Sequence, residues 1–480
     1  MEAGLPARLT RDGAAPKIGI VHLGPGAFFR AFNAVYTDEA MARAGGDWGI
    51  RAVSLRSATA RDELKAQGCA YTSVTLSPEG RQARVIGSVS DVLVAPEDPE
   101  AVIAAMADPD VHVVSLTITE KGYCHNPATG RMNADHPDIS HDLAALDAPR
   151  SAPGFIVAAL ARRKDAGLRP FTVLSCDNLP SNGPLARGVV TEFARRTDAD
   201  LARWIEDHGR FPATMVDRIT PATTEADIDA LEQAEGYRDP ACVVHEPFRQ
   251  WVIEDDFAGP RPAWEAAGAQ IVASVEAHEL MKLRCLNGTH STLAYLGYLA
   301  GYETIAETTA DADFARLCER LWADEIVPTL TPPEGEDLPA YCAALLDRYR
   351  NPAIQHRTWQ IAMDGSQKLP QRILGTIRDN LAAGRVPEGL CLAVAAWMTY
   401  VGGVDEHGKA IDVRDPLADT LRAASAGADG VWDKVGALLA QREVFDAALA
   451  EDARFREAVT SAFERLQARG SRATVAEYVR

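Results

Sequence analysis

The chain has 480 residues, of which 47% are hydrophobic and 24% are charged, a composition that indicates a globular fold and excludes wholesale disorder. This length exceeds one ordinary hydrophobic core, so we expect two large domains. The formal net charge is −19, from 49 basic and 68 acidic residues, which argues against nucleic acid or an anionic membrane as the main partner. A small anionic substrate stays compatible with this charge, because a pocket can be locally basic.

The cysteines and the N-terminus bear on the cellular compartment. Eight cysteines are scattered along the chain, and none forms a C-x-x-C pair or stands at structural-zinc spacing. We therefore expect reduced thiols and no metal site. Residues 1–17 lack the apolar stretch of a signal peptide, and no apolar run reaches the roughly 18 residues of a membrane span. The sequence predicts a cytoplasmic protein.

A nucleotide-binding signal opens the chain. The β-branched run 17–23 predicts a buried strand, a helix is expected over 27–43, and a second strand over 50–55. The turn between the first two contains Gly24, Gly26, Ala27 and Phe28. In dinucleotide-binding folds such glycines let backbone N–H groups approach a pyrophosphate, so these four residues are candidate coenzyme contacts. The third glycine of the full fingerprint is absent, and methyltransferases and plain tight turns also contain G-x-G.

The choice of coenzyme stays open at the end of the second strand. The segment 55–59 has no carboxylate that could bind the ribose hydroxyls of NAD, and Arg56 and Arg61 lie nearby instead. An arginine at this place can pair with the 2′-phosphate of NADP, although ordinary solvated loop charge explains both residues equally well.

Further strands are predicted over 71–76, 84–89, 111–119 and 171–175, and a helix over 154–166. Glu120 and Lys121 follow one of these strands and Asn178 follows another, at the strand ends where open α/β sheets bind ligands. From residue 276 onward helical periods replace strand signals. We therefore predict an α/β chain with an N-terminal Rossmann-type dinucleotide-binding domain (1–275) and a mostly α-helical C-terminal domain (276–480).

The segment 276–299 carries three polar residues in a helical pattern. On an ideal α-helix, Asn287 lies roughly 140° and His290 roughly 80° round from Lys282, so all three share one side. An amine, an amide and an imidazole together are typical of a site that moves a proton and holds oxygens. A surface helix with three unrelated polar residues is the alternative.

Five motifs occur in order along the chain. They are G-x-G-x-F at Gly24, S-C-D-N at Ser175, M-V-D-R-I-T-P at Met215, K-x-x-x-x-N-x-x-H at Lys282 and D-G-S-Q-K-L-P at Asp364. With this set the chain resembles the polyol-specific long-chain dehydrogenases, the mannitol dehydrogenase family, over residues 20 to about 416. The resemblance implies nicotinamide-dependent, metal-independent interconversion of a secondary alcohol and a ketone in a cleft between the two domains, with NAD as the expected coenzyme and NADP left open. It also implies a monomer or a homodimer.

The resemblance assigns roles by motif position. Lys282 matches the general acid and base, which needs a pKa lowered from about 10.4 by burial or by neighbouring charges. Asn178 and Asn287 match the amides that hold the reacting oxygen, and His290 matches the residue that orients the substrate. The remaining matches are Glu120 and Glu279 in a proton path to solvent, and Asp217 and Lys368 in the substrate site.

Some residues depart from the usual family pattern. Phe29 and Phe32 replace two histidines of the usual loop, with a consequence that the sequence leaves open. Lys121, Arg249 and Gln360 look like the fructuronate reductase branch of the family. A hexuronate carries a carboxylate that needs a cationic partner when it loses water, and Lys121, Arg249 and Lys368 are the candidates.

The function predicted from the sequence is NAD-linked reduction of D-fructuronate to D-mannonate, with mannitol or arabinitol dehydrogenation as the alternative. From other classes, a nucleotide-binding regulator without catalysis would not need Lys282 together with Asn287 and His290. A methyltransferase would leave that helix unexplained.

Overall fold

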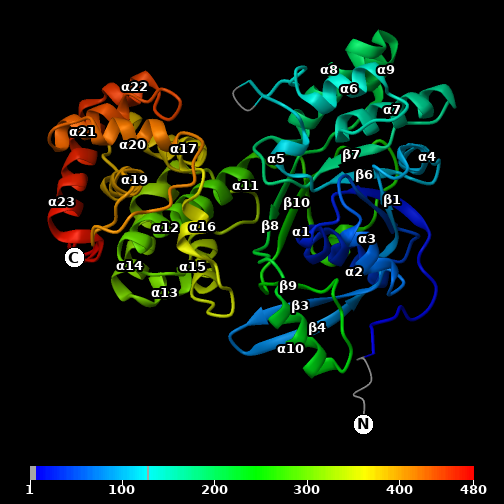
Figure 1. Cartoon of the computed structure of the whole chain (residues 1–480), viewed down its shortest axis with the longest axis horizontal. Helices are drawn as coiled ribbons and strands as arrows, with labels where there is room; N and C mark the ends of the chain where they lie inside the picture. The colour runs from blue at the N-terminus through cyan, green and yellow to red at the C-terminus, as the bar shows by residue number, and fades with distance from the viewer. Residues whose placement is uncertain (1–6, 127–128) are drawn as a thin grey trace. The chain divides into compact units, whose positions relative to one another are not determined.

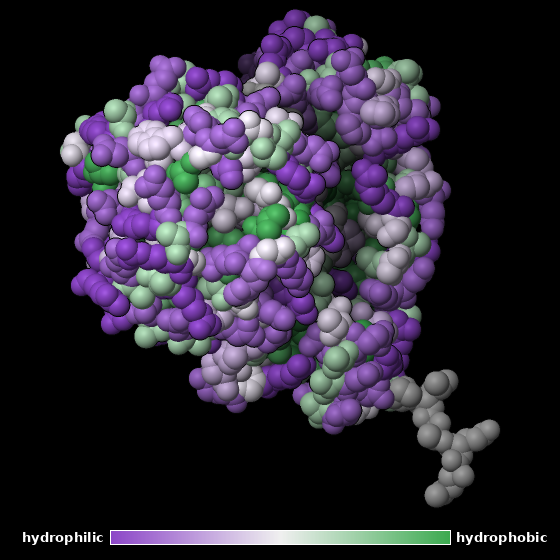
Figure 2. Space-filling model, turned by 60° about the vertical axis from the view of Figure 1, so that its left-hand side comes forward, coloured by the Kyte–Doolittle hydropathy of each residue, from purple (hydrophilic) through white to green (hydrophobic). Residues whose placement is uncertain are grey.

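The computed structural model describes residues 7–126 and 129–480 (Figure 1). The chain forms two compact units, an N-terminal unit that ends at Glu276 and a helical unit that begins at Ala277. Among the described residues, no helix is both long and apolar enough to cross a membrane. The face shown in Figure 2 is mostly hydrophilic, with apolar side chains in smaller patches.

A five-stranded parallel sheet forms the centre of the N-terminal unit. Its strand order is β5 (Val89–Val94), β2 (Gly49–Ser54), β1 (Ile18–Leu23), β6 (Val113–Leu116) and β7 (Thr172–Ser175). Side chains alternate between the two faces of a strand. Val21 and Leu23 of β1 accordingly lie in one buried core and Ile20 in the other. Both faces are covered, which explains the continuous apolar runs in the sequence.

Helices pack on both faces of this sheet. One core includes residues of α4 (Pro99–Ala107), α7 (Ala152–Asp165) and α8 (Asn182–Thr197), and the other includes residues of α1 (Ala27–Ala31) and α2 (Asn33–Ala44). The arrangement is the doubly wound Rossmann-type fold, as the sequence predicts.

Two smaller sheets complete the N-terminal unit. Their strand orders are β4 (Gly80–Ile86), β3 (Tyr71–Ser77) and β9 (Val243–His245), and β11 (Gln270–Val272), β10 (Gln250–Glu254) and β8 (Thr214–Asp217). The predicted strand over 84–89 is wrong, because β4 ends at Ile86 and β5 begins at Val89 in a different sheet. The Gly87 N–H donates to Asp38 Oδ1 at 2.9 Å, and this contact with α2 fixes the turn between them.

The helix predicted over 27–43 is two helices, α1 and α2, which meet at Phe32. Phe32 leaves the helical conformation (φ −130°, ψ −82°), and its fully buried ring lies 4.9 Å from the ring of Phe28 and 5.7 Å from that of Trp251. Phe29 is also fully buried and stacks on His22 at 3.7 Å. Phe29 and Phe32 therefore both fill the core of the N-terminal unit.

The helical unit is built around α12 (Thr289–Leu299) and α19 (Glu388–Val401), whose residues are mostly buried in one apolar core. In its described residues it contains isolated β-bridges and no strand longer than a bridge. Its other helices are α11 (Glu276–Met281, which begins at the last residue of the N-terminal unit), α13 (Ile305–Ala310), α14 (Ala312–Arg320), α15 (Leu338–Tyr349), α16 (Thr358–Ala362), α17 (Gly365–Leu369), α18 (Gly375–Ala382), α20 (Ala418–Ala426), α21 (Val431–Leu439), α22 (Ala447–Glu451) and α23 (Ala453–Tyr478).

Candidate active site

The turn after β1 has the geometry of a coenzyme-binding loop. Gly24 adopts a left-handed conformation (φ +95°), and a Cβ there would collide with the carbonyl oxygen of Thr117, so only glycine fits. At Gly26 no heavy atom lies within 4 Å of the position that a Cβ would take. The backbone of Gly26 is therefore open to a close-approaching pyrophosphate, and Ala27 and Phe28 follow it as the start of α1.

His22 holds this turn in place, a role that the sequence analysis missed. Its Nε2 lies 3.2 Å from the Gly24 carbonyl oxygen and 2.9 Å from Thr117 Oγ1, and its Nδ1 lies 2.8 Å from Ser115 Oγ. Burial lowers the pKa of His22 to about 3, so the imidazole is neutral. With Nε2–H donating to the Gly24 carbonyl, Nδ1 accepts from Ser115. The sequence feature that could have identified His22 is its position as a histidine inside an apolar strand.

The two arginines after β2 differ in their partners. Arg61 forms ion pairs with Asp62 and Glu97. Arg56 lies exposed two residues beyond the end of β2. Of these two cations, Arg56 is therefore the one with the accessible charge that could meet a coenzyme phosphate.

The buried carboxylate of Asp177 joins the ends of β6 and β7. Its Oδ1 accepts from the Thr119 N–H at 2.8 Å and its Oδ2 from the Ile118 N–H at 3.1 Å, and Thr119 adopts a left-handed conformation (φ +62°). Two loops are thus held together at the carboxyl edge of the sheet. One is α5 (Thr119–Gly122), which presents Glu120 and Lys121 to solvent, and the other presents Asn178.

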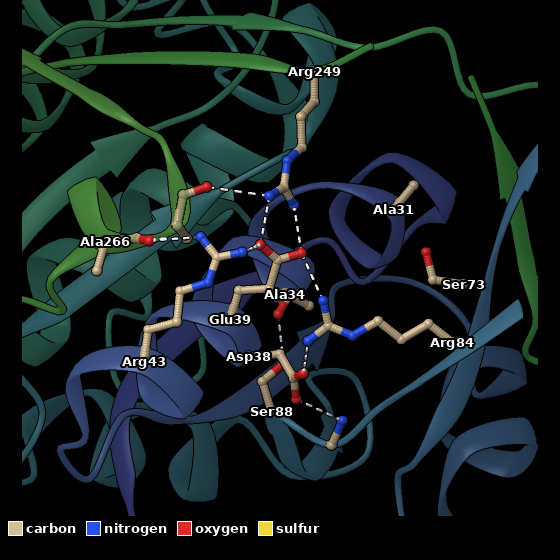
Figure 3. A network of polar contacts seen from close by, with 12 residues as sticks. Ala31, Ala34, Asp38, Glu39, Arg43, Ser73, Arg84, Ser88, Arg249 and Ala266 are labelled. Carbon is tan, nitrogen blue, oxygen red and sulfur yellow. Dashed lines mark hydrogen bonds and ion pairs between the residues drawn. The ribbon is translucent and has the colours of Figure 1, made fainter. Parts of the chain in front are cut away.

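Arg249 already has a carboxylate partner in its own unit (Figure 3). Its guanidinium donates from Nη1 to Glu39 Oε1 at 3.0 Å and from Nη2 to Oε2 at 2.5 Å, and it lies over the ring of Tyr36. Burial alone would raise the pKa of Glu39, but hydrogen bonds and charge from Arg249, with the charges of Arg84 and Arg43, lower it. The predicted contact of Arg249 with a substrate carboxylate gains no support here, because Glu39 already occupies both terminal nitrogens of the guanidinium.

Asp217 and Glu279 lie in different units. Asp217 is the last residue of β8, buried, and paired in register with Gln250 of β10. Glu279 is partly buried in α11, three residues before Lys282. Residues i and i+3 are neighbours on a helix surface, so Glu279 lies near the start of the Lys282 segment.

The segment Lys282–Gly288 is a π-helical turn between α11 and α12, within the helical pattern predicted over 276–299. Backbone hydrogen bonds in a π-helix join residues five apart, so Lys282 and Asn287 begin and end one turn. An α-helix would separate them by roughly 140°. Lys282 is 8% exposed and Asn287 is partly buried. A π-helix turns through a smaller angle per residue than an α-helix, so the amine and the amide lie closer together around the helix axis than the α-helical 140°.

His290 follows this turn at the start of α12. Its ring stacks on Tyr349 at 5.3 Å and meets the edge of His356 at 4.6 Å. Burial lowers the pKa of His290 well below its ordinary value, and the charges of nearby basic groups lower it further, so the ring is neutral. Within the described part of the chain, His290 Nε2 is buried without a hydrogen-bond partner. Such an atom is available to a bound ligand.

Several basic groups act on the buried ring of His290. The charges that act on its pKa come from His356, Arg372, Arg348 and Lys368. Lys368 in α17 donates from Nζ to the carbonyl oxygens of Met363 at 2.5 Å and Ile361 at 3.4 Å. Burial first, and then the charge of Arg372, lowers the pKa of Lys368 to about 8. Lys368 was predicted from its motif, whereas Arg348 and Arg372 were not. For Arg372 the available signal was its spacing of four residues from Lys368.

The structure therefore gathers the predicted residues into two groups. The N-terminal unit holds the coenzyme turn and, at the carboxyl edge of its sheet, Asn178, Glu120 and Lys121. The helical unit holds Lys282, Asn287 and His290, with Lys368 close enough for its charge to act on His290. Among residues 7–126 and 129–480, no group of three or more His, Cys, Asp or Glu side chains is arranged to hold a metal ion.

A Rossmann-type unit followed by a helical unit with a buried lysine, an amide and a neutral imidazole defines the class of a two-domain oxidoreductase. Residues 18–266 match the mannitol dehydrogenase Rossmann domain, and residues 274–467 match the mannitol dehydrogenase C-terminal domain. The chain belongs to the mannitol dehydrogenase family, which confirms the resemblance read from the motifs.

Relatives along the whole chain agree with this assignment. The chain is 49% identical to an uncharacterised oxidoreductase of Escherichia coli (strain K12), over 97% of this chain and 95% of the relative. It is 46% identical to D-mannonate oxidoreductase of the same organism, over 99% of each. A ternary complex of Pseudomonas fluorescens mannitol 2-dehydrogenase with NAD and D-mannitol is 39% identical, with a TM-score of 0.86 and coverage of 99% of this chain and 97% of that one.

Proposed function

We propose that this protein is an NAD(H)-linked, metal-independent reductase of a sugar acid, which converts the ketone of D-fructuronate into the secondary alcohol of D-mannonate and catalyses the reverse reaction. The observation that carries the proposal is the positive charge beside His290, where Arg372 donates to Ser291, the next residue along the chain, and the charges of Arg372 and Lys368 act on the buried ring. A hexuronate brings a carboxylate to balance such charge, whereas a polyol brings none. The similarity to D-mannonate oxidoreductase supports the same substrate.

The coenzyme is proposed to bind at the turn after β1. Left-handed Gly24 and open Gly26 would hold the pyrophosphate, with Ala27 and Phe28 at the start of α1 beside it. NAD is present in the mannitol 2-dehydrogenase complex, which supports NAD here. When bound, the nicotinamide supplies or accepts the hydride. Exposed Arg56 at the end of β2 keeps NADP(H) as the second coenzyme to test.

Lys282 is proposed to move the proton. In ketone reduction its ammonium would donate a proton to the oxygen on which negative charge develops, and in alcohol oxidation its neutral amine would take that proton back. The amide of Asn287, one π-helical turn away, would donate a hydrogen bond to the same oxygen and stabilise its alkoxide character. Asn178 is proposed as a second amide donor.

The other site residues are proposed to position the substrate or to pass protons to solvent. His290, neutral and with Nε2 unpartnered, would hydrogen-bond a sugar hydroxyl. Buried Asp217 and the cations Lys368 and Lys121 are proposed to contact the polar groups of the sugar. Glu279, three residues before Lys282, and exposed Glu120 are proposed to connect the lysine to solvent.

The same machinery would serve a mannitol or arabinitol dehydrogenase, and the 39% identity to a mannitol 2-dehydrogenase favours this as the second candidate. The two functions differ in whether the substrate carries a charge. The distinguishing group is therefore the carboxylate at C1 or C6, and the proton-transfer residues are common to both.

The test is steady-state NADH oxidation with D-fructuronate and D-fructose side by side, repeated with NADPH. We expect kcat/KM to favour D-fructuronate by at least a hundredfold, which corresponds to about 2.7 kcal/mol of transition-state discrimination. Oxidation of D-mannonate and D-mannitol with NAD gives the control in the reverse direction. A preference for D-fructose would contradict the proposal and make the protein a polyol dehydrogenase.

A further inference from the structure

Arg372 is a partly buried cation without a carboxylate partner. It lies in the π-helical turn Pro370–Leu374, and its Nη1 donates to Ser291 Oγ at 3.1 Å. Within the described ranges this is its one side-chain hydrogen bond, and it makes no ion pair with a carboxylate there. A guanidinium has five N–H donors, so most of its capacity is left for another group.

The backbone of Arg372 packs against the segment 282–290, which carries the proposed proton-transfer lysine. Gly288 ends the π-helical turn that begins at Lys282, and a Cβ added at Gly288 would lie 2.7 Å from the Arg372 carbonyl oxygen. Ser291, which accepts the hydrogen bond from Arg372, is the residue after His290. Arg372 is thus attached at two points to the segment that carries Lys282, Asn287 and His290.

Two other arginines that are at least partly buried each have a carboxylate partner, whereas buried Arg163 donates to backbone carbonyl oxygens instead. The fork of Arg249 is filled by Glu39, and Arg284, in the same π-helical turn as Lys282, donates to Asp379 with Nη2 and Oδ2 2.6 Å apart. A cation removed from water without a counter-charge is destabilising, and an arginine stays protonated under these conditions. The unfilled fork of Arg372 therefore favours an anion that arrives with the ligand.

We propose that Arg372 binds the carboxylate of the sugar-acid substrate through its unfilled guanidinium edge and so determines the preference for sugar acids over uncharged ketoses. This inference rests on the proposed function and names the side chain that gives it specificity. It replaces Arg249 as the arginine selected for this task. The charge of Lys368, four residues earlier, also acts on His290.

The experiment compares Arg372→Gln, Arg372→Lys and wild type with D-fructuronate and D-fructose. For Arg372→Gln we expect kcat/KM to fall at least a hundredfold with D-fructuronate and less than about threefold with D-fructose. Arg372→Lys keeps the charge and loses the fork, so it should recover part of the D-fructuronate activity. Arg249→Gln is the matched control, and it should leave the ratio of the two substrates unchanged. Thermal unfolding of each variant reports on folding.

Equal losses with both substrates, or an unchanged ratio in Arg372→Gln, would overturn the inference. If Arg372→Gln does not fold, the ratio of kcat/KM for D-fructuronate to that for D-fructose in Arg372→Lys tests the inference instead. A wild type that prefers D-fructose would contradict the proposed function, and inhibition then tests the arginine separately. D-mannonate should inhibit D-fructose reduction competitively, with Ki at least thirtyfold weaker in Arg372→Gln. No inhibition of the wild type, or the same Ki in both proteins, would overturn the inference as well.

Discussion

Single residues of the same type are distinguished here by their partners. His22 and His290 are both buried and neutral, yet both ring nitrogens of His22 are in hydrogen bonds, whereas Nε2 of His290 has no partner in the described chain. Arg249 and Arg372 differ in the same way. Because a polar group that loses water needs a partner, the unsatisfied member of each pair is the one suited to a ligand.

Lys368 gives a prediction about pH. Burial lowers its pKa from 10.5 to about 8, with Arg372 lowering it and Asp364 and Asp415 raising it. Below pH 8 its ammonium is charged and attracts a substrate carboxylate, and above pH 8 it loses this charge. We expect KM for D-fructuronate to rise as the pH passes 8, while Lys368→Arg, which stays charged, shows a flatter profile. Identical profiles of the two proteins from pH 7 to 9.5 would contradict the role of Lys368.

The sequence predicts some of these residues and not others for a physical reason. Lys282, Asn287 and His290 stand in one motif, and the family resemblance selected them, because the helical spacing alone also fitted a surface helix. The roles of Arg372, Asp177 and His22 depend on partners from distant segments, such as Ser291 for Arg372 and Thr119 for Asp177. Arg249 was predicted to meet a substrate carboxylate, because its partner Glu39 lies 210 residues away and the pairing cannot be seen in the sequence.

At the level of elements, the departures from prediction occur where tertiary contacts alter the backbone. The apolar pattern of 276–299 fits an α-helix, and it does not reveal that Lys282–Gly288 forms a π-helical turn. Gly288 permits the close approach of the Arg372 carbonyl oxygen to that turn. The break at Phe32 likewise follows from packing of its ring, which a helical pattern cannot show.

Gly288→Ala tests the importance of this contact. A Cβ 2.7 Å from a backbone oxygen forces one of the two segments to move, so we expect destabilisation of about 1–3 kcal/mol, measured by chemical denaturation, together with lower kcat. Gly188→Ala in α8 is the control, because nothing lies within 4 Å of its added Cβ and alanine favours a helix by up to about 1 kcal/mol. Equal stability of Gly288→Ala and wild type would contradict this prediction and show that the two segments can move apart at little cost in free energy.

At the level of the whole molecule, the two-part organisation could be predicted because its signals are local. Strand, glycine turn and strand indicated the Rossmann-type unit, and the change to helical periods indicated the helical unit. The net charge of −19 gave no indication of the cations around His290, because that site is set by a few residues folded together. The proposed chemistry divides accordingly, with the coenzyme turn in the N-terminal unit and the proton-transfer lysine in the helical unit.

The most direct test of the account is Lys282→Ala, with kcat and the Kd for NADH measured on the same protein. Loss of a general acid and base costs roughly 10²–10⁴-fold in rate, so we expect kcat to fall by this amount. NADH binding should stay within about twofold of wild type, because the coenzyme turn belongs to the other unit. Exposed Lys409→Ala is the matched control. Turnover retained in Lys282→Ala would contradict the proposed mechanism.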